Sequence, residues 1–307
     1  MPSKSPSSSS SISAALGPLS RWQDYLELCK PKVVALMVFT AIVGMLMADP
    51  GNVALETFIY ATLGIGLVAS SAAAINHVAD SRIDAAMDRT KLRPLPSGSL
   101  SKASVLAFAG IIGVIGMAIL IVKINMITAV LTFASLVGYA VIYTMYLKRA
   151  TPQNIVIGGA AGATPPLLGW TAVTGQVEAD GLLLLLIIFT WTPPHFWALA
   201  LYRKEEYAKV DIPMLPVTHG DDYTRLQITL YTILMCVITV FPFLTGMSGW
   251  VYLVSVLLLN AVFLYYAISL QITKSRTKAI NTFVYSIIYL MVLFAVLLID
   301  RYLPFLS

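Results

Sequence analysis

Charge and cysteine are scarce in this chain. Only 11% of its 307 residues are charged, whereas 58% are hydrophobic and the mean hydropathy is +0.82. A soluble domain carries about 25% charged residues, so the composition excludes a soluble globular protein and predicts an all-α bundle that crosses a membrane many times. The two cysteines, Cys29 and Cys236, match no metal-binding or redox spacing.

Apolar runs long enough to cross a bilayer as a helix, about 20 residues each, occur about nine times. They predict membrane spans near residues 33–48, 55–79, 103–122, 125–147, 154–173, 181–201, 227–245, 248–271 and 280–299. We expect one transmembrane domain over residues 21–307, preceded by a disordered, serine-rich cytoplasmic tail over residues 1–20. The Pro165-Pro166 pair lies inside the fifth run and predicts a break in that helix.

The positions of the basic residues provide an independent test of this count. Lys and Arg accumulate in the cytoplasmic loops of membrane proteins, and with nine spans all 20 of them except Lys123 and Arg301 fall on one side. This pattern predicts a cytoplasmic N-terminus and a periplasmic C-terminus. Because topology explains the net charge of +5, we expect no binding of nucleic acid. The N-terminal segment is not Arg-rich like a transit peptide, so a bacterial cell inner membrane is the expected location.

Oxygen-bearing side chains are concentrated where the second span ends. Asn76, Asp80, Asp84 and Asp88 follow one another at a spacing of four, and each step of four turns only about 40° around a helix, which predicts that all four share one face. Oxygen ligands of this kind suit Mg²⁺, which also binds water and substrate phosphates. The pattern therefore predicts a magnesium site for a diphosphate substrate. Two alternatives stay open for Asp88: it joins this site, or it pairs with Arg89 or Lys91.

Other polar residues are compatible with more than one interpretation. The loop over residues 202–226, which contains Glu206 and Asp211, is either a solvated connector or the second half of the site. His195 lies inside the sixth span beside a double proline, where a polar side chain is expensive; this favours a role toward substrate over a bond to a freed carbonyl. His77 follows Asn76, and whether it belongs to the site stays open.

Several of these segments resemble a known family. The series Asn76-x-x-x-Asp80-x-x-x-Asp84, continued by Asp88-Arg89-Thr90-x-x-Arg93-Pro94-Leu95, is similar to the first signature of the UbiA superfamily of intramembrane prenyltransferases. Further similar segments are Lys30-Pro31-Lys32-Val33, the run from Tyr146 to Trp170, and Pro194-His195-Phe196-Trp197 followed by Tyr202-Arg203-x-x-Glu206-Tyr207. The last two resemble the branch of the family that farnesylates haem. One feature departs from most of the superfamily, since Val210 stands where a second Asp-x-x-x-Asp would place its final acid.

The resemblance implies a UbiA-like fold and the transfer of a farnesyl group from farnesyl diphosphate to a vinyl group of haem b, which gives haem O. It also implies contact with haem A synthase or the terminal oxidase assembly, besides the lipid bilayer. We expect Asn76, Asp80 and Asp84 to be catalytic and, with Glu206, to hold Mg²⁺. The diphosphate would meet four cations, and His195 would meet the haem. These cations are Arg93, Lys148, Arg149 and Arg203.

Two alternative functions remain at this point. The protein could prenylate an aromatic ring, as relatives in quinone pathways do, although the Pro-His-Phe-Trp segment and the single acid Glu206 argue against it. It could also be a secondary transporter, because acids and broken helices inside a membrane mark ion pathways as well. A transporter would place such groups near the bilayer midplane, whereas these carboxylates are predicted at the cytoplasmic end of a span.

Overall fold

The computed structural model describes residues 18–303, which form helices and connecting loops without a strand. The α-helices are α1 (Pro18–Leu28), α2 (Pro31–Ala48), α3 (Leu55–Ala86), α4 (Lys102–Ile119), α5 (Met126–Val137), α6 (Lys148–Ala150), α7 (Asn154–Gly162), α8 (Pro165–Thr174), α9 (Ala179–Tyr202), α10 (Lys204–Ala208), α11 (Leu215–Thr218), α12 (Asp221–Ile238), α13 (Phe241–Leu244), α14 (Trp250–Thr273) and α15 (Arg276–Tyr302). Two π-helical segments, η1 (Leu120–Ile124) and η2 (Gly138–Leu147), extend α4 and α5. The predicted tail lies outside the described residues except for residues 18–20, which begin α1.

Eight helices within residues 18–303 are long and apolar enough to cross a membrane. They correspond to every predicted span except the fifth, residues 154–173. That segment forms two shorter helices, α7 and α8, because the chain breaks after Gly162 and restarts at Pro165. The predicted break at the double proline is therefore present: proline has no amide hydrogen to continue a helix but is well accommodated in the first turn of a new one. The all-α membrane fold is confirmed, with one crossing interrupted.

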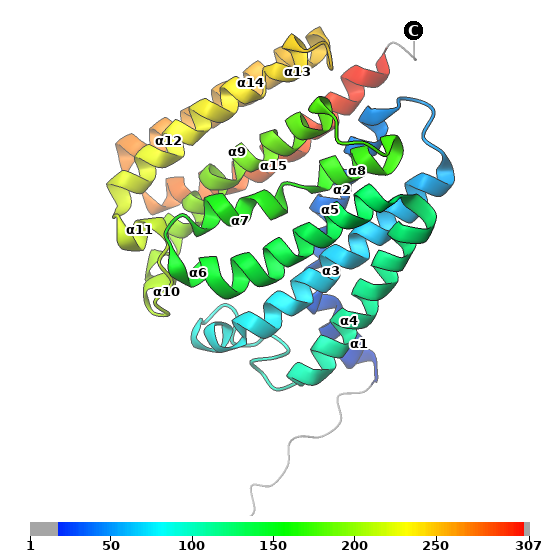
Figure 1. The fold of residues 1–307 in the computed structure, drawn as a ribbon. Coiled ribbons are helices and arrows are strands. Elements are labelled where there is room, and N and C mark those ends of the chain that lie inside the picture. Colours follow the sequence, from blue (N-terminus) through cyan, green and yellow to red (C-terminus); the bar gives the residue numbers. More distant parts are fainter. Residues whose placement is uncertain (1–17, 304–307) are drawn as a thin grey trace, which may run out of the picture.

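Together α7 and α8 connect the two ends of the bundle (Figure 1). The start of α7 follows α6, whereas at the end of α8 the backbone carbonyl of Thr171 accepts a hydrogen bond of 2.9 Å from Asn125, at the start of α5. The end of α15 lies beside the end of α2, where the Tyr302 hydroxyl donates to the Leu46 carbonyl at 3.3 Å. Helix α1 and the end of α15 are therefore at opposite ends of the molecule.

The helices that surround the middle of the bundle contact one another in the order α2, α3, η2, α7, α9, α15 and back to α2. Helix α8 packs across one end of this ring, against α2, α3, α5 and α9. The approach of α8 to α2 requires glycine, because a Cβ on Gly169 would lie 1.9 Å from the Ala41 carbonyl oxygen and one on Gly44 would lie 2.0 Å from that of Pro166. The backbones of α8 and α2 are thus tightly packed against each other.

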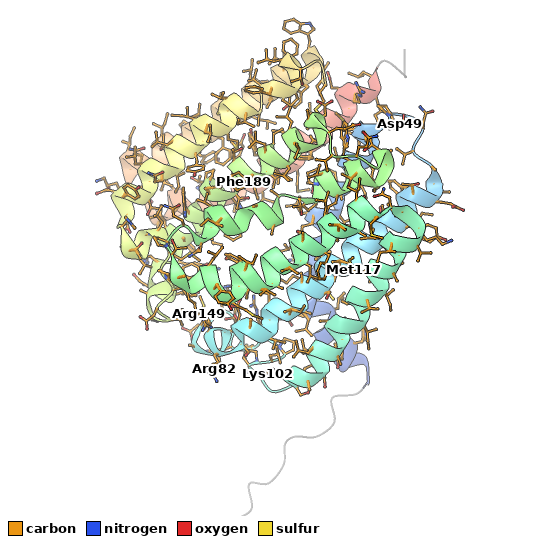
Figure 2. The ribbon with its side chains drawn as sticks, in the orientation of Figure 1. Asp49, Arg82, Lys102, Met117, Arg149 and Phe189 are labelled. Carbon is orange, nitrogen blue, oxygen red and sulfur yellow. The ribbon has the colours of Figure 1, made fainter. Side chains whose placement is uncertain are left out.

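Charged side chains gather at the two ends of the bundle. Arg82, Lys102 and Arg149 lie together at the end where α3 finishes, and Asp49 lies at the opposite end (Figure 2). Between these ends the outer surface is apolar, with exposed side chains such as Val114, Val254 and Ile272. Extensive exposed apolar surface between two charged ends is what a multi-pass membrane protein presents to lipid.

Candidate active site

The oxygen donors predicted from the sequence lie in the last three turns of α3. This helix continues seven residues beyond the predicted end of its apolar run, so that Asn76, Asp80 and Asp84 are all helical. Their exposed fractions are only 4%, 6% and 5%. Asn76 Nδ2 donates to Asp80 Oδ2 at 2.9 Å, which orients the carboxylate. We call these three residues the ladder.

Asp88 does not belong to the ladder. Helix α3 ends at Ala86, and Met87 has an extended backbone, so the prediction that all four residues share a helix face is wrong for Asp88. Its side chain is 80% exposed and forms an ion pair with Lys91 at 2.8 Å. The hydrogen bond from Lys91 and the charge of that residue, followed by the charge of Lys209, lower the pKa of Asp88. Of the two alternatives left open by the sequence, the structure therefore shows the local pair.

Each ladder residue is contacted by a cation from a different segment of the chain. Lys30 Nζ donates to Asn76 Oδ1 at 2.5 Å, and Lys148 Nζ lies 2.6 Å from Asp80 Oδ2. Arg93 donates to Asp84 Oδ2 at 2.8 Å. Buried carboxylates need such partners, because an unpaired charge in a low-dielectric environment is strongly unfavourable. The ladder therefore has three positive groups already within bonding distance of its oxygens.

Lys30 reaches the ladder from an unusual backbone conformation. Its φ of 49° and ψ of 60° are left-handed, a region that non-glycine residues seldom adopt and that the following Pro31 disfavours further. Burial, and next the positive charge of Arg93, lowers the pKa of the Lys30 ammonium to about 8, while the charges of Asp80 and Asp84 act in the opposite direction. Strained residues cluster at functional sites, and this one bonds directly to the ladder.

The π-helix η2 places one further residue, Thr144, beside the ladder. The Thr144 hydroxyl donates to the Tyr139 carbonyl, five residues earlier, at 2.7 Å, and accepts from Asn76 Nδ2 at 3.2 Å. Lys148 follows directly after this segment. Tyr143 of η2 packs against Gly158 of α7, where a Cβ would lie 2.1 Å from the aromatic ring. Wide helical turns of this type frequently occur at functional sites.

The loop after α3 folds back onto the helix and thereby positions Arg93. The fully buried Thr90 donates from its hydroxyl to the Asp84 carbonyl at 2.9 Å. This short bond adds a donor to a backbone acceptor in the last turn of α3, whose only other partner among the described residues is the Met87 amide at 3.4 Å. The loop then turns so that Arg93, nine residues after Asp84, contacts the carboxylate of that residue.

The second charged loop lies beside the first one but does not bond to the ladder. Glu206 pairs with Arg203 at 3.1 Å, and no hydrogen bond or ion pair joins Glu206 to Asp80 or Asp84. Burial, and next the charges of Arg203 and Arg93, lowers the pKa of Arg89, whereas Tyr207 and Glu206 raise it. Arg89 is thus close to Arg203 and Glu206 of the second loop as well as to Arg93 of its own loop.

Two other residues considered from the sequence, Arg149 and Asp211, do not contact the ladder. Arg149 is exposed and forms no ion pair with any residue from 18 to 303, unlike its neighbour Lys148. Asp211 is exposed as well, in a left-handed turn with φ of 52°. Within the described part of the chain, no three acidic, histidine or cysteine side chains converge as a metal-binding group.

The two carboxylates of the ladder each keep one oxygen without a hydrogen bond or ion pair to the described part of the chain. Oδ2 of Asp80 and Oδ2 of Asp84 accept the bonds described above, whereas neither Oδ1 has a partner among residues 18–303. Neither Oδ1 atom is enclosed by protein. Both oxygens are therefore available to a ligand, and oxygen is the donor that Mg²⁺ prefers.

The two membrane-embedded histidines have different surroundings. Neither ring nitrogen of His77 has a partner, and both are sealed from solvent. His195, on α9, contacts Ser286 of α15 through Nδ1 at 2.6 Å, and its ring lies between those of Trp191 and Phe283. No bond joins either histidine to the ladder. His195 is therefore part of a separate group of polar and aromatic side chains deeper in the bundle.

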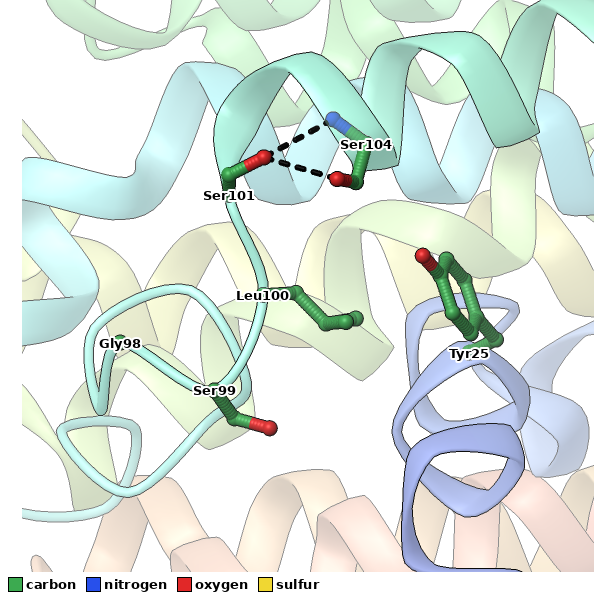
Figure 3. A pocket seen from close by; sticks show the side chains of 6 residues that line it. All are labelled: Tyr25, Gly98, Ser99, Leu100, Ser101 and Ser104. Atoms are coloured by element: carbon green, nitrogen blue, oxygen red, sulfur yellow. Dashed lines mark hydrogen bonds between the residues drawn. The ribbon is translucent and has the colours of Figure 1, made fainter. Parts of the chain in front are cut away.

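A small surface pocket of about 330 Å³ lies between α1 and the start of α4 (Figure 3). Tyr25, Leu100 and three serines contribute to its lining, and the Ser101 hydroxyl there accepts from the backbone amide of Ser104 at 3.1 Å, which caps α4. None of the predicted site residues lines it. This pocket therefore does not bear on the ladder.

Comparison with known families decides the relationship suggested by the sequence. A model described as the UbiA prenyltransferase family matches residues 37–298. The chain belongs to this family. It is 56% identical over 302 residues to protoheme IX farnesyltransferase of Marinobacter nauticus, and the match covers 98% of this chain and 97% of that protein. The protein of the same name from Hahella chejuensis is 57% identical over 294 residues, with 96% and 97% of the two chains covered.

Solved structures of other proteins have the same fold. A structure concerning digeranylgeranylglyceryl phosphate synthase has a TM-score of 0.78 at 18% identity, and covers 92% of this chain and 99% of that one. A UbiA homologue from Archaeoglobus fulgidus bound to GPP and Mg²⁺ has a TM-score of 0.63 at 15% identity, with 89% and 99% covered. At such low identity these similarities establish the UbiA fold alone.

Two residues that contact the ladder of this UbiA family member were not identified as site residues from the sequence. In the sequence, Lys30 belongs to the Lys30-Pro31-Lys32-Val33 segment that resembles the family but has no assigned role there, and no pattern distinguishes Thr144. The Lys30-Pro31 pair beside an apolar run was an available signal. Nothing in the composition of residues 138–147 indicates a π-helix, so Thr144 could not have been found in the same way.

Proposed function

We propose that the protein transfers the farnesyl group of farnesyl diphosphate to a vinyl group of haem b, giving haem O. The observation that carries the proposal is the pair of buried carboxylates, Asp80 and Asp84, each paired with a cation from another segment and each retaining an available oxygen. Relatives at 56–58% identity that are named protoheme IX farnesyltransferase support haem as the acceptor. The Pro194-His195-Phe196-Trp197 segment supports the same acceptor over an aromatic ring.

The cations around the ladder are the proposed diphosphate site. Arg93 and Lys148 already contact the two carboxylates, and Lys30 contacts Asn76. A diphosphate placed against the ladder would exchange part of these contacts for its own oxygens, since ammonium and guanidinium groups bind phosphate strongly. Arg203, which pairs with Glu206 on the adjacent loop, is proposed as a further diphosphate contact. Arg149, exposed and without an ion pair among the described residues, lies outside these contacts with the ladder.

The residues of the ladder also fit Mg²⁺. Asp80 and Asp84 offer hard oxygen donors whose Oδ1 atoms have no protein partner, and Asn76 orients Asp80 through its amide. In the homologue from Archaeoglobus fulgidus, Mg²⁺ is bound together with GPP. When bound here, Mg²⁺ would neutralise negative charge on the diphosphate and make it a better leaving group. Asp80 and Asp84 would hold the ion, with Asn76 beside them, and Glu206 of the adjacent loop is proposed as a further ligand.

The reaction proceeds through an allylic cation. The bond between the first farnesyl carbon and the diphosphate breaks, the diphosphate leaves with both electrons, and Lys30, Arg93 and Lys148 stabilise the charge it carries. The vinyl carbon of haem then attacks the cation, and water adds to the resulting carbocation with loss of a proton. The apolar bundle around His195 and Trp191 keeps water away until that last step.

We further propose that the protein lies in the bacterial inner membrane with the ladder on the cytoplasmic side. All but two of its basic residues are placed on that side when the crossings are counted with α7 and α8 as one. His195 would contact the haem deeper in the membrane, and the product would serve a terminal oxidase. The position of the acids at the end of α3, away from the midplane, supports this assignment over a transporter.

Mass analysis of extracted haems tests the proposal. A host without its own haem farnesyltransferase would be compared with and without this gene, and the variant with both Asp80→Asn and Asp84→Asn would serve as a matched control. We expect a farnesylated haem only in cells that express the unaltered protein. A prenylated quinone precursor in place of haem O would instead support the aromatic acceptor.

A further inference from the structure

The imidazole of His195 is held on both faces. Its ring stacks on Trp191 with centroids 4.2 Å apart and on Phe283 with centroids 4.6 Å apart, at interplanar angles of 19° and 26°. Trp191 lies one turn before His195 on α9, and Phe283 belongs to α15. Rotation of the imidazole is therefore blocked by aromatic rings from two helices, and only the edge of the ring can meet a ligand.

Ser286 determines which nitrogen of His195 carries the proton. The Ser286 hydroxyl donates its one hydrogen to the Phe283 carbonyl at 2.6 Å. Its contact of 2.6 Å with His195 Nδ1 must then have the imidazole as donor. A neutral imidazole that donates from Nδ1 has its lone pair on Nε2. The hydrogen-bond network thus assigns a single tautomer to His195.

The lone pair on Nε2 is available to a ligand. No residue between 18 and 303 bonds to this atom, and it is not sealed by protein, whereas both nitrogens of the other buried membrane histidine, His77, are sealed. Ser286 also braces the neighbouring ring, since Trp191 Nε1 donates to the Ser286 carbonyl at 2.8 Å. One serine therefore fixes the proton of His195 and the tryptophan that covers its face.

We infer that Ser286 is a positioning residue that presents the Nε2 lone pair of His195 to the iron of the haem substrate. This inference rests on the proposed function, because it requires haem as the acceptor. Neutral imidazole nitrogen is a common axial ligand of haem iron, and a histidine that binds a metal almost always donates its other N–H to a second group. In a purely structural histidine, Nε2 would be expected to have a hydrogen-bond partner, as Nδ1 does. In His195 both faces and Nδ1 are held, and Nε2 alone has no partner among the described residues.

The position of His195 suits an acceptor that must meet the farnesyl chain. His195, on α9, lies eight residues before Arg203, the residue that directly follows this helix; eight residues span about 12 Å along a helix. Ligation of the iron at this depth would anchor the porphyrin within the apolar bundle, while the diphosphate stays at the end of α3 among its cations. Trp191 belongs to an extended cluster of buried apolar side chains. Such a cluster favours binding of the flat, hydrophobic porphyrin ring over binding of water.

A spectral titration of the full-length protein with haem b tests this role. Four variants would be compared with the unaltered protein in detergent: His195→Ala, Ser286→Ala, Ser286→Thr and Thr282→Val. Thr282 is the matched control, because it is a buried hydroxyl one turn earlier on α15 that bonds only to the Lys278 carbonyl. The absorption and resonance Raman bands of histidine-ligated haem are the readout, and thermal stability is recorded for every variant.

We expect histidine ligation in the unaltered protein and its loss in His195→Ala. Ser286→Ala should weaken haem binding about 10-fold to 100-fold and alter the ligation bands, as losses of supporting partners at metal ligands do. Ser286→Thr, which keeps the hydroxyl, should restore both, and Thr282→Val should behave like the unaltered protein. Binding of farnesyl diphosphate should be the same in all of them.

Two results would overturn the inference. One is a Ser286→Ala variant that binds haem with unchanged affinity and bands; the other is an unaltered protein that makes haem O yet shows no histidine ligation. In both cases the proposed function stands and only the role of Ser286 fails. If the unaltered protein neither binds haem nor forms haem O, the proposed function fails and this inference fails with it.

Discussion

The two charged loops at the end of α3 and after α9 differ in how their acids are paired. On α3, Asp80 and Asp84 are buried, and the cation beside Asp80 is 68 residues away in the sequence. On the second loop, Glu206 pairs with Arg203 three residues earlier, and Glu205 is 74% exposed. Local exposed pairs contribute little and are expected in any solvated connector. Long-range buried pairs require the whole fold to assemble them, which is why we place the reaction at the ladder.

Removing one charge from the ladder should have the largest effect. Asp80→Asn keeps the shape of the side chain but leaves Lys148 without its counter-charge and weakens the diphosphate site. We expect kcat for haem O formation to fall about 100-fold or more. The measurement uses proteoliposomes of the full-length protein supplied with haem b, farnesyl diphosphate and Mg²⁺.

Asp88→Asn is the matched control for that variant, because Asp88 lies in the same loop region but is exposed beyond the helix end. We expect its activity to stay within about twofold of the unaltered protein, as for most surface substitutions. Similar losses in both variants would mean that burial in the ladder does not distinguish functional from solvated acids.

Lys148→Met and Arg149→Met form the next comparison, between adjacent cations. Lys148 contacts Asp80 at 2.6 Å, whereas Arg149 is exposed without an ion pair among the described residues. We expect kcat/KM for farnesyl diphosphate to fall about 10-fold to 100-fold for Lys148→Met and to change less than about twofold for Arg149→Met. A larger loss of kcat/KM for Arg149→Met than for Lys148→Met would mean that the diphosphate binds outside the ladder.

Glu206→Gln should have a smaller effect on the reaction than either ladder variant. The Glu206 side chain is one-third exposed and its partner is local, so we expect a change in KM for farnesyl diphosphate of about fivefold at most. Glu205→Gln, at the neighbouring exposed position paired with Arg276, should leave KM unchanged. A loss for Glu206→Gln as large as that for Asp80→Asn would show that the second loop supplies an equal half of the site.

The smallest effect is expected for an exposed pair of the second loop. Asp221→Asn removes the partner of Lys204, which lies 2.7 Å away with both side chains more than one-third exposed. The free energy of unfolding should change by less than about 1 kcal/mol, measured by thermal unfolding in detergent. A larger loss would mean that this loop is held as tightly as the ladder.

Much of the fold could be predicted from hydropathy and helix periodicity. Runs of about 20 apolar residues identify long membrane helices well, and the double proline located the break between α7 and α8. The position of Asp80 and Asp84 on one face followed from their spacing. The error at Asp88 arose because spacing alone does not indicate where a helix ends, and the extended backbone of Met87 ended this one.

The contacts of the site were much less predictable. Lys30 reaches Asn76 across 46 residues from a left-handed backbone, and Ser286 reaches His195 across 91 residues. Both depend on how helices pack, which a single sequence does not contain. Thr144 depends on a π-helical turn that has no compositional signal. Charge and residue type therefore identified the candidates, while tertiary packing determined which of them meet.

Binding of farnesyl diphosphate without turnover tests the central claim most directly. In the absence of haem, the full-length protein and its Asp80→Asn/Asp84→Asn double variant would be titrated with farnesyl diphosphate and Mg²⁺ in a calorimeter. We predict binding by the unaltered protein and an affinity about 100-fold weaker in the variant, a loss of about 2.7 kcal/mol. Equal affinity in the two proteins would contradict the account, because the diphosphate would then bind away from the ladder.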